Sequence, residues 1–150
     1  IGIIKVLKGN QKCLYLGNLK SKRDWGHAKE FVNAQWKILQ QKKPDDFVIA
    51  TGKNYSVKDL VNLVLKKLDI SYLWKKDKNG FEYEIAINNI GKIKKLQIIV
   101  KQEKIYFRPN EVHNLVGDYR KAKKLLKWKP KINFDQLISE MIDSDLKQIT

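Results

Sequence analysis

The run Phe47-Val48-Ile49-Ala50 constrains the fold most, because it is apolar at every position. A strand with one solvated face alternates apolar and polar residues, whereas a strand buried on both faces, as in a parallel sheet, is apolar throughout. Thr51-Gly52 ends the run, and Ser56 followed by Asp59 has the spacing of a capping box, with aspartate in place of the usual glutamate or glutamine. We therefore expect a strand–loop–helix unit over residues 47–68 of an α/β fold.

Four further segments carry apolar residues at the spacing of a helix face. Gly9 follows the first segment as a stop signal, and Pro44 lies beyond the second. Asp24, Asp118 and Asn133 precede the last three segments, at positions from which a side chain can cap a first turn. The expected helices cover residues 1–8, 27–41, 119–126 and 134–146.

Short strands are predicted at Leu14-Tyr15-Leu16 and over residues 70–74. Large apolar side chains occupy every second position of residues 81–87, which is the pattern of a half-exposed strand. After a turn, residues 92–100 run back. We interpret residues 78–100 as a hairpin inserted on the surface.

The chain is strongly basic, with 31 lysines and arginines against 16 acidic residues and a net charge of +15. Such a charge is typical of nucleic-acid-binding proteins. However, the lysines are spread over nearly every segment, and arginine, the preferred reader of bases and phosphates, occurs only three times. We therefore expect no nucleic-acid partner, and we keep a basic nucleic-acid-binding module as the alternative from a different class.

No apolar run approaches the ~20 residues of a membrane-spanning helix, so we expect no membrane partner. Cys13 is the only cysteine, which excludes an internal disulfide and fits a cytoplasmic protein. We expect it to be a small buried residue. Because the only methionine is Met141, Ile1 is not a translation start, and we expect further chain upstream.

Several kinds of site lack the residues that they need. His27 and His113 are far apart, and no cluster of Cys, His or carboxylate residues has the spacing of metal ligands. The eight glycines do not form a dinucleotide-binding fingerprint. Two Tyr-x-x-x-Lys pairs occur, Tyr72 with Lys76 and Tyr119 with Lys123, and because about one is expected by chance at this lysine content, neither is assigned a catalytic role. We therefore assign no catalytic residue, cofactor-binding residue or metal ligand within the chain.

Two of the three arginines lie in loops next to a carboxylate. Arg23, beside Asp24, is expected at the entrance to a helix, where backbone amides and the helix dipole favour an anion. Arg108 lies shortly before Glu111. Arginine binds two phosphate oxygens at once, so the two loops can close on a diphosphate while Glu111 accepts a ribose hydroxyl. Alternatively, Arg23 pairs with Asp24 or a neighbour, and Arg108 with Glu111, as surface ion pairs.

Several short motifs follow one another along the chain: Cys13-Leu14-Tyr15-Leu16-Gly17-Asn18, Arg23-Asp24-Trp25-Gly26-His27-Ala28-Lys29, Gln40-Gln41, residues 44–52, Tyr106-Phe107-Arg108-Pro109-Asn110-Glu111-Val112 and Trp128-Lys129-Pro130. Together they resemble the C-terminal part of the GDP-mannose 4,6-dehydratases, a family of extended short-chain dehydrogenases/reductases. Trp25-Gly26-His27 and residues 46–52 favour this family over other nucleotide-sugar enzymes. Trp25 and His27 are expected to serve packing and helix entry.

This resemblance implies the C-terminal portion of an extended Rossmann-fold enzyme with its small α/β substrate-binding subdomain. Residues 1–150 would form mainly the substrate-binding part, and the cofactor-binding Rossmann half would lie upstream. The implied enzyme is a lyase that dehydrates GDP-mannose to GDP-4-keto-6-deoxymannose, towards GDP-fucose or related deoxysugars. It would use NADP bound by the upstream half, as a homo-oligomer. Another nucleotide-sugar epimerase or dehydratase of the superfamily stays the nearer alternative.

The resemblance also implies roles for individual residues. Arg23 and Arg108 would hold the diphosphate, Glu111 would lie near the ribose, and Gly17-Asn18 beside the nucleotide. The family's catalytic residues precede the position that matches Ile1, so we expect the chain to be inactive alone. Helices made to cover a sheet outside the chain should expose apolar faces and cause association or poor solubility.

Overall fold

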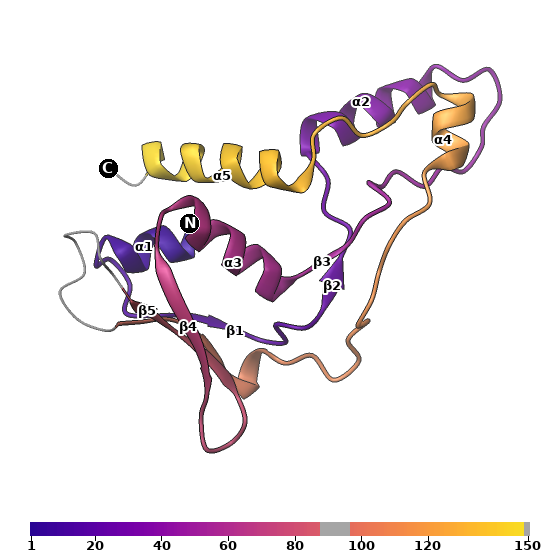
Figure 1. Cartoon of the computed structure of the whole chain (residues 1–150). Helices are drawn as coiled ribbons and strands as arrows, with labels where there is room; N and C mark the ends of the chain where they lie inside the picture. The colour runs from indigo at the N-terminus through magenta and orange to yellow at the C-terminus, as the bar shows by residue number, and fades with distance from the viewer. Residues whose placement is uncertain (88–96, 149–150) are drawn as a thin grey trace.

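The computed structural model describes residues 1–87 and 97–148, whose elements form two groups joined by extended segments (Figure 1). The sheet lies with α1, α3 and α5 in one group, α2 and α4 form the other, and β2 and β3 run between them. In chain order the elements are α1 (Gly2–Leu7), β1 (Leu14–Leu16), β2 (Lys22–Arg23), α2 (Ala28–Leu39), β3 (Tyr55–Ser56), α3 (Val57–Lys67), β4 (Ser71–Lys76), β5 (Glu82–Ile87), β6 (Gln97–Gln102), the 3-10 helix η1 (Lys104–Tyr106), α4 (Arg120–Leu125) and α5 (Phe134–Gln148).

Strand β6 lies inside the four-stranded sheet, whose order is β1-β6-β5-β4. It pairs in parallel with β1, where Leu14 faces Val100, and antiparallel with β5. Ile99 and Val100 are fully buried. The antiparallel pairing of β5 with β6 confirms the hairpin predicted over residues 78–100. Its placement as a surface insertion is wrong, because the apolar end of this segment lies inside the sheet. The predicted turn and the start of the return run, residues 88–96, lie outside the described residues.

Helices α1 and α3 cover one face of the sheet and bury the main core (Figure 1). Fully burying an aliphatic side chain of this kind stabilises a fold by about 1.5–3 kcal/mol, so this cluster holds the first group of elements together. The buried members are Ile3, Val6, Val61, Leu65, Ile99 and Val100.

The predicted ends of these helices are confirmed. Helix α3 begins with a capping box: the Ser56 hydroxyl accepts a hydrogen bond from the Asp59 backbone N–H at 3.0 Å, and the Asp59 carboxylate accepts one from the Ser56 N–H at 2.8 Å. Helix α1 stops before Gly9, which has a φ of +78°. Only glycine takes up this backbone conformation without steric cost.

Helix α5 packs along α3 and is capped as predicted. Asn133 accepts a hydrogen bond from the N–H of Gln136 at 2.9 Å and donates its own N–H to the Gln136 side chain at the same distance. The ring of Phe134 stacks on Tyr55 and on Trp25, with centroids 4.0 Å and 5.5 Å apart. Trp25 therefore serves packing, as expected, and ties the start of α5 to the segment after β2.

The second group is a small core between α2 and α4, to which residues 47–50 contribute. Phe47 and Ile49 pack against Ala34, Ala122, Leu126 and Trp128. The strand predicted over residues 47–50 is not formed. A strand exists only where its backbone N–H and C=O groups pair with those of a neighbouring strand. No described strand pairs with this segment, and Val48 is 53% exposed.

One face of α2 is apolar and exposed. Val32, Trp36 and Leu39 recur at helical spacing and are 61%, 59% and 80% exposed. The expectation that helices of this chain expose apolar faces is confirmed. None of the described helices is long and apolar enough to cross a membrane.

Candidate functional site

The candidate site forms around β2, which is joined on both sides by segments distant in sequence. Lys22 pairs with Ser56 and Arg23 with Tyr55 in the antiparallel β2–β3 ribbon. On the other side, the Lys22 N–H donates to the carbonyl of His113 at 2.8 Å, and the Leu115 N–H donates to the Lys22 carbonyl at 3.3 Å. This pairing brings the segment after Glu111 alongside β2.

Arg23 and Glu111 meet as a half-buried ion pair. The Nη2 atom of Arg23 lies 3.3 Å from Oε1 of Glu111, and their side chains are 26% and 15% exposed. Nη1 also donates to the carbonyls of Val112 at 2.6 Å and Lys22 at 2.8 Å. The alternative pairs Arg23–Asp24 and Arg108–Glu111 are therefore not formed, and Arg23 fastens the loop that carries Glu111 to β2.

Asp24 does not cap α2, so that prediction is wrong. The ring nitrogen Nδ1 of His27 occupies the helix entrance and accepts the Lys29 N–H at 3.1 Å, and Nε2 lies 2.9 Å from the Glu140 carboxylate. Arg23 lies in β2, upstream of this entrance, and not in the first turn of α2. The role expected for His27 at helix entry is confirmed.

Asp24 binds instead the loop that follows residues 47–50. Its Oδ1 accepts hydrogen bonds from the N–H and the hydroxyl of Thr51, at 2.8 Å and 2.5 Å, and its Oδ2 accepts the Gly52 N–H at 2.9 Å. A fourth bond, from the Gly117 N–H at 3.2 Å, reaches the segment before α4. One carboxylate thus holds three segments together beside Arg23.

Gly17 lies against the chain just before Arg108. A Cβ at Gly17 would lie 2.2 Å from the carbonyl oxygen of Tyr106, so no side chain fits there. Asn18 follows and lines, with Phe107 and Gln102, a hollow of about 230 Å³. The structure thus places Gly17-Asn18 next to the loop that bears Arg108.

Arg108 itself is exposed, and within residues 1–87 and 97–148 its side chain makes no hydrogen bond or ion pair. The structure therefore brings Arg23 into contact with Glu111. It also brings Gly17 next to the residues that precede Arg108. It shows no contact between Arg23 and Arg108. Arg120, the third arginine, pairs with Asp118, whose carboxylate also accepts the Arg120 N–H at 2.9 Å at the start of α4. Hydrogen bonds from Arg120 lower the pKa of Asp118.

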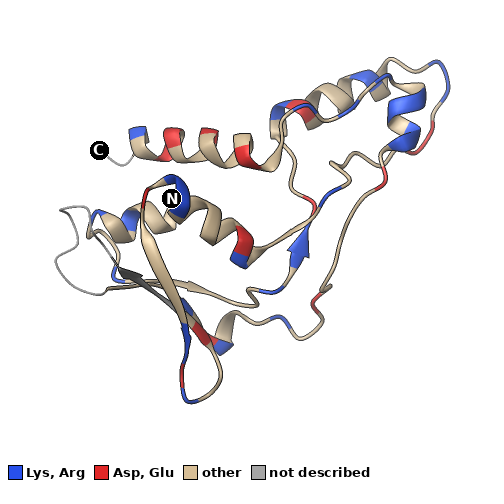
Figure 2. Ribbon diagram, in the orientation of Figure 1, with Lys and Arg blue, Asp and Glu red and all other residues tan. Residues whose placement is uncertain are grey.

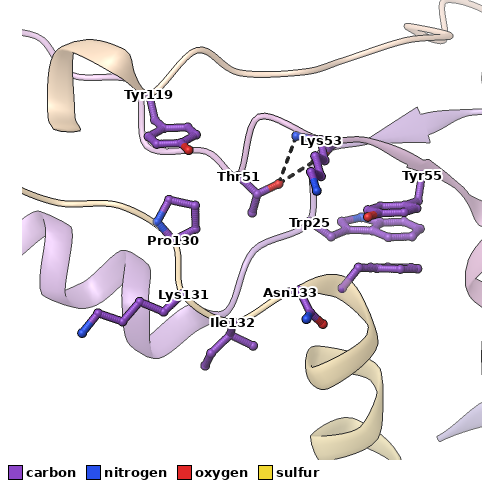
Figure 3. A pocket seen from close by; sticks show the side chains of 10 residues that line it. Trp25, Thr51, Lys53, Tyr55, Tyr119, Pro130, Lys131, Ile132 and Asn133 are labelled. Atoms are coloured by element: carbon purple, nitrogen blue, oxygen red, sulfur yellow. Dashed lines mark hydrogen bonds between the residues drawn. The ribbon is translucent and has the colours of Figure 1, made fainter.

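A second hollow, of about 220 Å³, lies between the two groups of elements (Figure 3). The rings of Trp25 and Tyr55, each stacked on Phe134, line one side of it, Tyr119 and Pro130 line the other, and Thr51 lies between them. Sequence reasoning did not find this arrangement, because its aromatic residues are far apart in the chain. Among the described residues no group of three metal-ligating side chains forms.

The fold is shared with solved enzymes of the Rossmann short-chain dehydrogenase class. The protein RMD from Pseudomonas aeruginosa, solved with NADPH, superposes with a TM-score of 0.69 at 14% identity, over 98% of this chain and 40% of that chain. The dTDP-glucose 4,6-dehydratase from Bacillus anthracis superposes with a TM-score of 0.68 at 17% identity, over 99% and 38%. The predicted α/β class, the C-terminal portion of an extended Rossmann enzyme, is thereby confirmed.

Sequence similarity narrows the class to one family. The model of the GDP-mannose 4,6 dehydratase family matches residues 1–141. The chain is 43% identical to the GDP-mannose 4,6-dehydratase of Vibrio cholerae serotype O1 over 98% of its length, and 40% identical to that of Homo sapiens over 97%. The chain belongs to the GDP-mannose 4,6-dehydratase family. It spans 40% and 37% of the length of these two relatives.

Proposed function

We propose that residues 1–150 form the substrate-binding part of an NADP-dependent GDP-mannose 4,6-dehydratase, a lyase. The complete cytoplasmic enzyme, a homo-oligomer, would convert GDP-mannose to GDP-4-keto-6-deoxymannose and water. The observation that carries the proposal is the Arg23–Glu111 ion pair beside the Arg108 loop, in a chain of this family. The pair holds the loop that carries Arg108 and Glu111 against β2.

In this proposal, each site residue has one task. Arg108, exposed and without an ion-pair partner in the described part of the chain, binds the diphosphate. Arg23 keeps the Glu111 loop on β2 and faces the same diphosphate, and Glu111 lies near the ribose. Gly17 allows the chain to pass close to Tyr106, so that Asn18 borders the nucleotide.

Catalysis and cofactor binding are assigned to a part of the protein outside this chain. The described residues do not fit a dinucleotide site: Gly17 follows β1, but β1 leads into β2 instead of the helix whose N-terminus would meet a pyrophosphate. No step of the reaction is therefore assigned to a cofactor held by these residues. The isolated chain should not turn over GDP-mannose in the presence of NADP.

Binding measurements test the proposal. GDP-mannose titrated into the chain should bind saturably, and Arg108→Gln should weaken its binding by about tenfold, since a charge-assisted hydrogen bond contributes about 1.5–3 kcal/mol. Arg120→Gln is the matched control, because Arg120 is an exposed arginine bound to Asp118. Equal losses in the two variants, or turnover by the chain alone, would contradict the proposal.

Other nucleotide sugars and oligonucleotides, used as competing ligands, distinguish the proposed function from its two alternatives. Preference for UDP- or dTDP-sugars over GDP-mannose would identify a sister epimerase or dehydratase. Oligonucleotide binding that falls steeply with salt would identify a nucleic-acid-binding module. We expect GDP-mannose to bind most tightly, and oligonucleotides to show no saturable binding at 0.15 M salt.

A further inference from the structure

A hollow of about 390 Å³ lies between α2 and the connection from α4 to α5, and neither Arg23 nor Glu111 lines it. We call it the lysine pocket. Its volume lies within the ~300–1,000 Å³ typical of small-ligand sites. Figure 2 shows basic residues along α2, the helix that forms one side of this pocket. The pocket is lined by Lys29, Glu30, Asn33, Lys37, Lys127, Trp128, Lys129 and Lys131.

Lysine is strongly enriched in this lining. The chain has 31 basic residues, three of them arginine, so 28 of its 150 residues are lysine, and about one or two lysines are expected among any eight residues. Five are present here, against a single glutamate, which leaves a net charge of +4. A concave surface lined by charge of one sign raises the local concentration of the opposite ion.

The glutamate does not neutralise the lysines. The carboxylate of Glu30 accepts the backbone N–H of Lys131 at 2.8 Å and that of Ile132 at 3.3 Å. Lys37 donates to the carbonyl of Leu126 at 3.2 Å. Among the described residues, the ammonium groups of Lys29, Lys127, Lys129 and Lys131 form no ion pair.

The backbone under these lysines is held in place. Trp128 is 4% exposed, and its indole N–H donates to the carbonyl of Glu30 at 3.0 Å. Together with the Glu30 carboxylate, this bond fixes the connection against the first turn of α2. Every second residue from Lys127 to Lys131 is lysine, while Trp128 is buried between the first two. Only the side chains need to move when an anion binds.

We propose that the lysine pocket binds a compact phosphate oligoanion, such as inorganic triphosphate or the triphosphate of a nucleotide. Four unpaired ammonium groups around one hollow match a ligand with several negative charges better than a single phosphate. Lys131 also lines the hollow beside Trp25, but the pocket contains none of the residues assigned to GDP-mannose, so this proposal does not depend on the proposed function.

Calorimetric titration of the whole chain with sodium triphosphate tests the proposal. Lys129→Gln combined with Lys131→Gln should lower the affinity by about tenfold at low salt. Lys42→Gln combined with Lys43→Gln is the matched control, because it removes the same charge from exposed lysines outside the pocket. The control variant should bind triphosphate within about twofold of the unaltered chain. The circular dichroism spectra of both double variants should match that of the unaltered chain.

Other outcomes would overturn the proposal. Equal losses in the two double variants would mean attraction by net charge alone, and a loss confined to Arg108→Gln would place the anion at the arginine loop. Absence of saturable binding by triphosphate at low salt would also refute it. ATP and triphosphate distinguish the two sources of the ligand: tighter binding of ATP would identify a nucleotide, and equal binding would identify the free anion.

Discussion

Asp24 accepts a hydrogen bond at 3.2 Å from the backbone N–H of Gly117, which lies 93 positions further along the chain. There is no room for a side chain at Gly117, since a Cβ would lie 2.3 Å from that of Ala50. The segment after Glu111 therefore passes directly over residues 47–50 and stays on Asp24. The arrangement of the candidate site depends on this carboxylate as much as on Arg23.

Asp24→Asn should destabilise the chain. An asparagine side chain keeps only one accepting oxygen and turns an NH₂ group towards N–H donors, so bonds from Thr51, Gly52 and Gly117 are weakened. We expect a loss of about 1.5–3 kcal/mol in the free energy of unfolding in urea. Asp143→Asn, an exposed position on α5, should change it by less than about 0.5 kcal/mol. Equal stability of the two variants would contradict the role of Asp24.

Gly17→Ala should displace the Arg108 loop. A Cβ 2.2 Å from the Tyr106 carbonyl oxygen forces backbone to move, which we expect to cost about 1–3 kcal/mol. Gly9→Ala separates this clash from backbone strain, because Gly9 has a φ of +78° and no atom within 4 Å of an added Cβ. Amide chemical shifts of residues 104–108 should change in the first variant and stay in place in the second.

The exposed face of α2 should cause self-association, as expected from sequence. Trp36→Gln combined with Leu39→Gln should shift sedimentation towards the monomer, because two large apolar side chains leave the surface. Ile105→Gln combined with Val112→Gln removes exposed apolar side chains elsewhere and serves as control. If the control disperses the chain equally well, the association is not a property of α2.

Cys13 should react slowly in the folded chain. Burial raises the pKa of its thiol above the ordinary value of 9.0, and the thiolate is the reactive form. Modification by a thiol reagent at pH 8 should therefore be at least about tenfold slower than in urea. Above pH 9.0 the unfolded thiol loses its proton first, so the unfolded state binds fewer protons and stability should fall. Cys13→Ser should make this decline smaller by the contribution of the thiol.

Local signals predicted the helices well. The capping box of Ser56 and Asp59, the Asn133 cap and the stop at Gly9 each depend on residues within one turn, and all are present. The strands β1, β4 and β5 were predicted from alternation or short apolar runs. The resemblance was specific for the same reason, because its motifs are short and contiguous.

The errors lie where a side chain meets a distant partner. Asp24 has the spacing of a helix cap, but it bonds to Thr51 and Gly117, and His27 caps the helix. Residues 78–100 have the local pattern of a peripheral hairpin, but β6 lies between β1 and β5 inside the sheet. The Arg23–Glu111 ion pair joins residues 88 positions apart in the chain, and it depends on how β2 pairs with its neighbours. No local pattern contains such information.

The parallel pairing of β1 with β6 also indicates the order in which we expect the chain to fold. Leu14 meets Val100 only after the intervening residues have closed into a loop, and each doubling of a flexible loop costs about 0.6 kcal/mol of entropy. Helix α3 and the β4–β5 pair form from neighbouring residues and shorten that loop before β1 docks. Docking of β1 then orients Gly17 and β2, so we expect the loops that carry Gly17, Arg23 and Arg108 to be the last part of the molecule to acquire their shape.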